Sequence, residues 1–132
     1  MAMLMHNAWM ISTATLEPSS PMAEISAMLD AVELQVLQQP EGLEIEETGS
    51  TYLENARLKA CTVAGLTGQW ALADDSGLVV PALGGAPGIH SARYSREGTD
   101  TANNEQLLKE MNALVGDTRN AYFYCALVLL RS

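Results

Sequence analysis

The stretch Ala71-Leu-Ala-Asp-Asp-Ser-Gly-Leu78 decides how this chain is organised. The apolar run from Trp70 to Ala73 ends in two adjacent carboxylates, a hydroxyl and a glycine, and a second apolar run extends from Leu78 to Leu83. We expect a buried strand that stops at Asp74, because open α/β sheets bind ligands beyond the ends of their strands. Adjacent like charges are costly to bury unless a cation or hydrogen-bond donors offset them. The alternative for this stretch alone is a polar turn between two strands.

The clearest helix precedes this stretch and is predicted over residues 51–67. Thr51 and Glu54 form a capping box at its start, and Gly68 is placed to stop it. Its expected apolar stripe consists of Leu53, Ala56, Ala60, Val63 and Ala64. Asn55 and Lys59 are four residues apart, so they share a face of the helix away from the middle of that stripe.

The remaining apolar patterns predict three more strands and two more helices, with an extended segment or short strand at residues 43–47. The strands are expected at 8–15, 33–37 and 121–130, and the helices at 22–31 and 101–115. The last strand is expected to be buried on both faces. The last helix should turn Leu107, Leu108 and Met111 inward. Alternating helices and strands predict an α/β fold, a mixed sheet flanked by helices, in one domain spanning residues 1–132.

Length and composition limit the classes of protein to which this chain can belong. The chain has 132 residues, of which 48% are hydrophobic, enough for one domain with a core. The net charge is −9 with no basic run, which argues against binding of a nucleic acid polymer. The apolar N-terminal residues 1–11 lack a basic region and are too short to span a bilayer, so we expect no signal peptide and no membrane segment. Cys61 and Cys125 have no paired spacing and are expected to be reduced core thiols, as Trp70 is expected to be core.

Four polar sets surround the central stretch. They are Glu46–Gly49 before the capped helix, Asn55 with Lys59 on it, Asp74–Gly77, and Ser91–Tyr94 after a glycine turn. Each has a plain alternative when it is taken alone. The glutamates could form a solvated acidic loop, the lysine could lie on the surface, and Arg93 could simply pair with a carboxylate.

Together the sets resemble the motifs of a known family. The three matching runs are residues 46–60, 71–78 and 83–94, which read EETGSTYLENARLKA, ALADDSGL and LGGAPGIHSARY. They are similar, in order and spacing, to motifs of the inosine triphosphate pyrophosphatases, also called dITP/XTP pyrophosphatases. The resemblance covers residues 41–131, about two thirds of the chain.

The resemblance implies hydrolysis of deaminated purine nucleoside triphosphates to a monophosphate and pyrophosphate. It also implies Mg²⁺ as cofactor, a cytosolic location, a homodimer, and an elongated α/β fold of two lobes with the substrate between them. No partner that is a membrane or a nucleic acid polymer is expected.

The chemistry of triphosphate hydrolysis fits the residues that carry the resemblance. The phosphate charge must be neutralised and a water must be oriented, and Mg²⁺ prefers carboxylate oxygens. Asp75 is expected to bind metal and to orient or deprotonate the water, and Lys59 to contact phosphate oxygens as a point charge. The expected metal ligands are Glu47, Asp74 and Asp75. The residues expected to bind substrate are Asn55, Ser76, Gly77, Ser91 and Arg93.

Two features depart from the family pattern. Where the family has a T-x-N-x-x-K motif, Pro18 and Pro21 stand in the places of its Asn and Lys, and Glu17 adds a negative charge. The family motifs that follow the last strand, G-[FY]-x-[FY]-D-P and S-H-R, have no match in this sequence. We therefore expect an ITPase-like fold lacking the C-terminal part, with a sheet edge exposed beside residues 121–130.

These departures leave three hypotheses open. The first is an active or once active pyrophosphatase of this family. The second is a divergent, catalytically impaired relative that binds a nucleotide, a metal or another subunit. The third is a structural oligomer built on the same fold.

Overall fold

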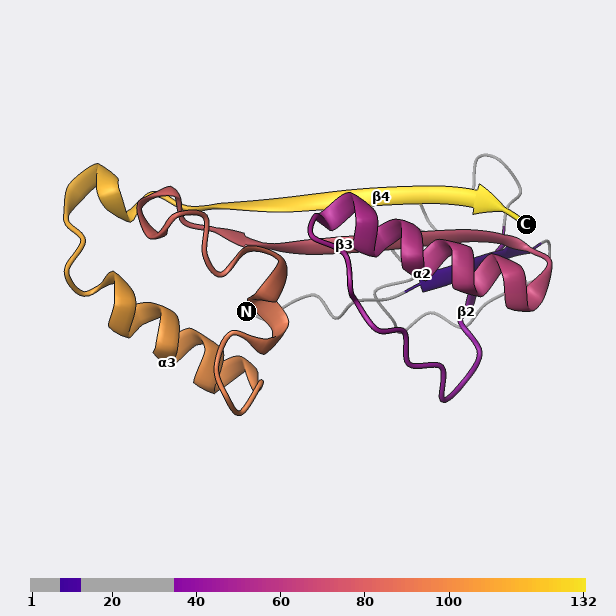
Figure 1. The fold of residues 1–132 in the computed structure, drawn as a ribbon, viewed down its shortest axis with the longest axis horizontal. Helices are drawn as coiled ribbons and strands as arrows, with labels where there is room; N and C mark the ends of the chain where they lie inside the picture. Colours follow the sequence, from indigo (N-terminus) through magenta and orange to yellow (C-terminus); the bar gives the residue numbers. More distant parts are fainter. Residues whose placement is uncertain (1–7, 13–34) are drawn as a thin grey trace.

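An antiparallel sheet forms the framework of the molecule (Figure 1). The computed structural model describes residues 8–12 and 35–132. Within them, the sheet has the order β2-β1-β3-β4, with strands β1 (Ala8–Ser12), β2 (Gln35–Gln38), β3 (Trp70–Val79) and β4 (Tyr122–Arg131). The prediction of an α/β fold is confirmed. Where we expected a mixed sheet, all three pairings between the described strands are antiparallel.

Two α-helices and three short 3₁₀ helices complete the described fold. They are α2 (Tyr52–Thr67), η2 (Pro81–Leu83), η3 (Gly88–Arg93), α3 (Asp100–Met111) and η4 (Gly116–Arg119). Figure 1 shows β3 and β4 as a long ribbon, with α2 beside the end where the chain finishes and α3 at the other end. The loop at residues 43–47, which had two expected forms, is an extended loop and not a strand.

The central stretch lies inside β3 and not at a strand end. Both the expected stop at Asp74 and the alternative turn are wrong, because β4 pairs with every residue of β3, from Trp70↔Arg131 to Val79↔Tyr122. Successive side chains of a strand point to opposite faces of the sheet. Asp74 and Asp75 therefore leave β3 in opposite directions, and only Asp75 lies on the face covered by α2.

Helix α2 begins where the capping chemistry predicted. Thr51 adopts an extended conformation and its hydroxyl accepts a hydrogen bond from the Glu54 amide at 3.1 Å. The Glu54 carboxylate accepts one from the Ser50 amide at 2.7 Å, one residue before the cap. Gly68 ends the helix in the left-handed conformation, with φ of 66°.

The buried face of α2 is rotated from the one that periodicity predicted. Ala56, Ala60, Val63 and Ala64 are buried as expected, but Leu53 is 58% exposed. The polar pair Asn55 and Lys59 is buried instead, at 0% and 3% exposure. The reason is electrostatic, because both side chains reach the Asp75 carboxylate on β3. Hydrogen bonding to a buried charge thus sets which side of the helix meets the sheet.

Among the described residues, two small cores stabilise the two ends of the ribbon. One lies under α2 and is built from Ala60, Val63, Ala64, Ala71 and Ala73. The other joins the end of β3 to α3 and is built from Val80, Leu107 and Met111. Leu107 and Met111 point inward as expected, whereas Leu108 is 55% exposed.

Strand β4 is far more exposed than the sequence predicted. It is the edge of the described sheet, and only Ala126 is buried, while Phe123, Leu127 and Leu129 are more than half exposed. The expectation of burial on both faces is therefore wrong within the described residues, whereas the expected exposed edge is present. Trp70 was expected to be core but is 45% exposed, because it begins β3 at the rim of the sheet. Both cysteines are free as expected but lie on the surface.

Some expectations lie outside the described residues. They are the helix at 22–31, the loop that contains Pro18 and Pro21, and the last residues of the first strand. None of the helices in the described ranges is long and apolar enough to cross a membrane.

A pair of substitutions on α2 tests this packing. Val63→Ala removes two buried methyl groups, so we expect the free energy of unfolding to fall by about 2–3 kcal/mol. Leu66→Ala, on the exposed side of the same helix, should change it by less than about 0.5 kcal/mol. Urea denaturation followed by circular dichroism measures both. Equal losses for the two variants would contradict the observed orientation of α2.

Candidate functional site

Four charged side chains meet beside β3 and form what we call the ion-pair cluster: Glu47, Lys59, Asp75 and Arg93. The Lys59 ammonium lies 3.0 Å from Glu47 Oε1 and 3.3 Å from Asp75 Oδ1. Arg93 Nη1 lies 2.9 Å from the other oxygen of Glu47. The side chains of Lys59, Glu47 and Asp75 are only 4%, 7% and 1% exposed. Two buried carboxylates are thus held by two cations from separate segments.

Asn55 links the loop that carries Glu47 to the centre of β3. Its amide nitrogen donates to Asp75 Oδ2 at 3.2 Å, and its oxygen accepts from the Gly49 amide at 2.8 Å. Asn55 and Lys59 are one helical turn apart, so both can reach the same carboxylate. A side chain on Gly49 would lie 2.6 Å from the Asn55 oxygen, which explains a glycine there. Asn55 therefore supports Asp75 and is itself buried.

A cleft opens next to the ion-pair cluster. It has a volume of about 430 Å³ and is lined by the extended loop from Leu43 to Glu47 together with Gln39, Lys59 and Arg93. Arg93 is half exposed at the rim, whereas Lys59 and Glu47 form the buried wall. This size is within the range of small-ligand pockets. The cleft gives a ligand access to three members of the cluster, Glu47, Lys59 and Arg93, and Asp75 lies behind them.

Ser91 and Gly77 join η3 to β3 rather than facing the cleft. The Ser91 hydroxyl accepts from the Leu78 amide at 2.9 Å and donates to the Gly88 carbonyl at 2.6 Å. A side chain on Gly77 would lie 2.4 Å from the Gly88 oxygen and 2.6 Å from Ser91 Oγ. Only glycine permits this approach of the two backbones. This close contact, which we call the seam between β3 and η3, fixes the position of the segment that ends in Arg93.

Asn103 is a site-supporting residue that sequence reasoning missed. It is buried on α3, where its side chain accepts from the Ser95 amide at 2.7 Å and donates to the Ala92 carbonyl at 2.9 Å. These bonds hold the chain on both sides of Arg93. The run Asn103–Leu108 also fits the pattern of the family that the sequence resembles, and this fit was the available signal.

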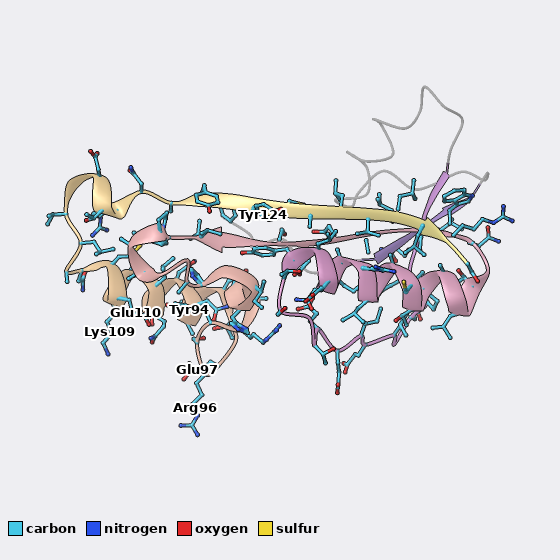
Figure 2. All side chains as sticks on the ribbon, turned by 45° about the horizontal axis from the view of Figure 1, so that its top comes forward. Tyr94, Arg96, Glu97, Lys109, Glu110 and Tyr124 are labelled. Atoms are coloured by element: carbon cyan, nitrogen blue, oxygen red, sulfur yellow. The ribbon has the colours of Figure 1, made fainter. Side chains whose placement is uncertain are left out.

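Tyr94 provides a second connection between η3 and α3. Its hydroxyl hydrogen-bonds the Glu110 carboxylate, and the two side chains approach each other in Figure 2. Burial, together with this hydrogen bond, raises the pKa of Tyr94 to about 12. The same bond lowers the pKa of Glu110. Because Tyr94 follows Arg93 directly, this bond also helps to fix the position of Arg93.

Asp74 and Ser76 lie on the other face of β3. Ser76 Oγ is 3.4 Å from Asp74 Oδ2, and both residues alternate with Asp75 along the strand. Burial, and then the charge of Asp74, raises the pKa of Cys125 on the neighbouring strand. The structure therefore brings together five of the predicted site residues, Glu47, Asn55, Lys59, Asp75 and Arg93, and separates Asp74 and Ser76 from them.

Tyr52 is the second residue that sequence reasoning missed. Its ring stacks on Tyr124 at 5.0 Å, and its hydroxyl lies against Gly77. The hydroxyl is buried and makes no hydrogen bond among the described residues. Burial, and then the charge of Asp75, raises the pKa of Tyr52. An aromatic residue in the first turn of a helix gives no sequence signal that its hydroxyl will be buried against a strand.

The chain is similar to a group of nucleotide-processing proteins. A sequence model described as the Ham1 family matches residues 20–132. A dITP/XTP pyrophosphatase of Prochlorococcus marinus (strain MIT 9313) is 52% identical over 106 residues, which cover 80% of this chain and 50% of that protein. One of Xanthomonas campestris pv. campestris (strain 8004) is 50% identical over 111 residues, covering 82% and 56%. The chain thus spans about half the length of these curated relatives.

Solved structures show the same likeness. A HAM1 protein from Coxiella burnetii superposes with a TM-score of 0.77 at 41% identity, covering 86% of this chain and 59% of that one. A nucleoside-triphosphatase, or dITP/XTP pyrophosphatase, from Mycobacterium abscessus gives a TM-score of 0.67 at 36% identity, with 84% and 60% covered. The fold described above is therefore shared with experimentally determined proteins.

Two glycine substitutions test the seam between β3 and η3. Gly77→Ala places a methyl group against the Gly88 oxygen, so we expect unfolding free energy to fall by about 1–3 kcal/mol. Gly65→Ala, in α2 with open space around it, should instead stabilise by about 0.5–1 kcal/mol. Thermal and urea unfolding report both changes. A Gly77→Ala variant as stable as the parent would show that the backbones are not in close contact.

Proposed function

Because this chain belongs to the Ham1 family, we propose that it is a nucleoside triphosphate pyrophosphatase that cleaves deaminated purine nucleotides. The substrates would be dITP, ITP and XTP, and the products a monophosphate and pyrophosphate. The observation that carries the proposal is the ion-pair cluster at the wall of a cleft. It combines two carboxylates with two cations, which are the groups that phosphoryl chemistry uses.

The carboxylates of Glu47 and Asp75 suit a divalent metal. Both already contact one cation, the Lys59 ammonium, so their oxygens converge on a common position. No three His, Cys, Asp or Glu side chains in the described ranges group into a metal site by themselves. Mg²⁺ commonly binds through one or two carboxylates and completes its shell with phosphate and water, so two suffice. When bound, Mg²⁺ would neutralise phosphate charge and polarise the phosphorus centre.

The remaining roles follow from position. Asp75 would accept a proton from the attacking water at a carboxylate oxygen, while Asn55 holds the other oxygen in place. Lys59 would contact the phosphate oxygens as a point charge. Arg93, half exposed at the rim of the cleft, would meet the substrate from the side of η3. Gly77 and Ser91 would support the segment that carries Arg93, through the contact between β3 and η3. Asp74 and Ser76 lie on the opposite face of β3 and would support the site from there without lining the cleft.

The proposal also covers the cellular location and the oligomeric state of the protein. The sequence resemblance leads us to expect a cytosolic homodimer that acts on small nucleotides. Light scattering of the purified protein would give its mass in solution. A monomer at all concentrations would contradict the dimer without affecting the proposed chemistry.

Substitution of the proposed base tests the function. The parent protein with Mg²⁺ should release pyrophosphate from dITP, ITP or XTP, and Asp75→Asn should lower kcat by about 10²–10⁴-fold, because it removes the proton acceptor. Asp117→Asn makes the same charge change at an exposed position in η4 and should keep full activity. Coupled detection of pyrophosphate measures all three.

The outcomes separate the hypotheses. Turnover that is lost only in Asp75→Asn supports the proposed enzyme. Nucleotide binding without turnover by the parent would instead support the impaired relative. Failure to bind or cleave any of the three nucleotides would reject the proposed function.

A further inference from the structure

Lys59 occupies the position between the two carboxylates that a metal would be expected to use. Its ammonium is within 3.3 Å of both Glu47 and Asp75, and its side chain is almost fully buried. A lysine that served only to contact phosphates would be free to extend into the cleft. Here the cation is instead bonded to Glu47 in the cleft wall and to Asp75 behind it.

Among the described residues, the formal charges of the four members of the ion-pair cluster sum to zero. Glu47 and Asp75 contribute two negative charges, and Lys59 and Arg93 contribute two positive ones. A divalent cation that entered this neutral arrangement would meet two cations at close range. In a poorly solvated site such repulsion is strong, so the resident ammonium opposes a metal that arrives alone.

We propose that Lys59 is an internal counter-cation that excludes free divalent metal from Glu47 and Asp75 until a nucleotide draws it away. The proposal rests on the proposed function, since the nucleotide phosphates provide the new partner. Lys59 has a flexible four-carbon stem and a compact charge, so its ammonium can turn from carboxylate to phosphate without moving α2. The metal then gains the two carboxylates at the moment when the phosphates arrive.

This exchange makes metal and nucleotide binding cooperative. The nucleotide removes the competitor of the metal, and the metal by the same linkage strengthens the binding of the nucleotide. The site is then closed to Mg²⁺ alone and open to Mg²⁺ with a triphosphate. If Lys59 only held the two carboxylates in position, its removal would instead weaken metal binding at the site.

Binding of Mn²⁺ alone tests the inference. Titration calorimetry without nucleotide should show Lys59→Met binding Mn²⁺ about tenfold or more tightly than the parent, because the competing charge is gone. Lys109→Met is the matched control, because it removes the same charge from the exposed face of α3, where Lys109 points away from the molecule (Figure 2). Its Mn²⁺ affinity should equal that of the parent.

A second variant covers the case in which Lys59→Met folds poorly. Arg93→Gln removes a half-exposed cation from Glu47, so the fold should tolerate it, and Mn²⁺ affinity should rise about threefold. If Lys59→Met is destabilised, added Mn²⁺ should also raise its melting temperature more than it raises that of the parent. Both readouts are independent of catalysis.

The results have defined meanings. Unchanged or weaker Mn²⁺ binding by Lys59→Met and Arg93→Gln would overturn the inference. With a non-hydrolysable inosine triphosphate analogue bound, the parent should approach the Mn²⁺ affinity of Lys59→Met, and no gain in affinity would also overturn it. Tighter Mn²⁺ binding by the variants together with no nucleotide cleavage by the parent would reject the proposed function while leaving the competition between lysine and metal established.

Discussion

The buried carboxylate of Asp75 is the constraint on which the rest of this structure depends. A charge in the middle of a sheet is strongly destabilising unless charged and hydrogen-bonding partners surround it. Asn55 and Lys59 supply those partners from a single helix, and their spacing of one turn determines how α2 lies across β3. The same contacts draw in the loop before the helix through Glu47 and Gly49. One acid thus connects strand, helix and loop.

The small side chains between α2 and β3 are the counterpart of this polar contact. The helix presents Ala60 and Ala64 to a strand that carries Ala71 and Ala73, all fully buried. Methyl groups let the two backbones approach closely, so that the amide of Asn55 and the ammonium of Lys59 can reach Asp75. Larger residues would fill the same space with apolar surface but would lift the helix away from the acid. The packing therefore serves the site as well as the core.

Local sequence signals predicted much of the fold and of the site. The rest depends on contacts between residues far apart in the sequence, which local signals do not show. The capping residues placed α2 correctly, and motif spacing named all five residues that meet at the site. Periodicity misassigned Asn55 and Lys59 because it treats polar residues as surface, and only the acid opposite them explains their burial. Asp74–Gly77 was misread as a strand end because its partner β4 lies about fifty positions later. The bond between Arg93 and Glu47 spans 46 positions, and the segment that carries Arg93 is held by Asn103, which lies outside the three matching motifs.

The acidity of the chain affects how the proposed nucleotide substrate would reach the site. The net charge of −9 opposes the approach of a polyanionic nucleotide at long range. At physiological ionic strength that field decays over about 8 Å, so charges close to the phosphates dominate the final encounter. Only two lysines exist in the sequence, and one of them is buried in the ion-pair cluster. A nucleotide that arrives with its metal carries a reduced charge, so the acidic surface discriminates against it less than against the free triphosphate. Surface charge and the proposed counter-cation role of Lys59 would thus favour the same proposed ligand, the metal–nucleotide complex.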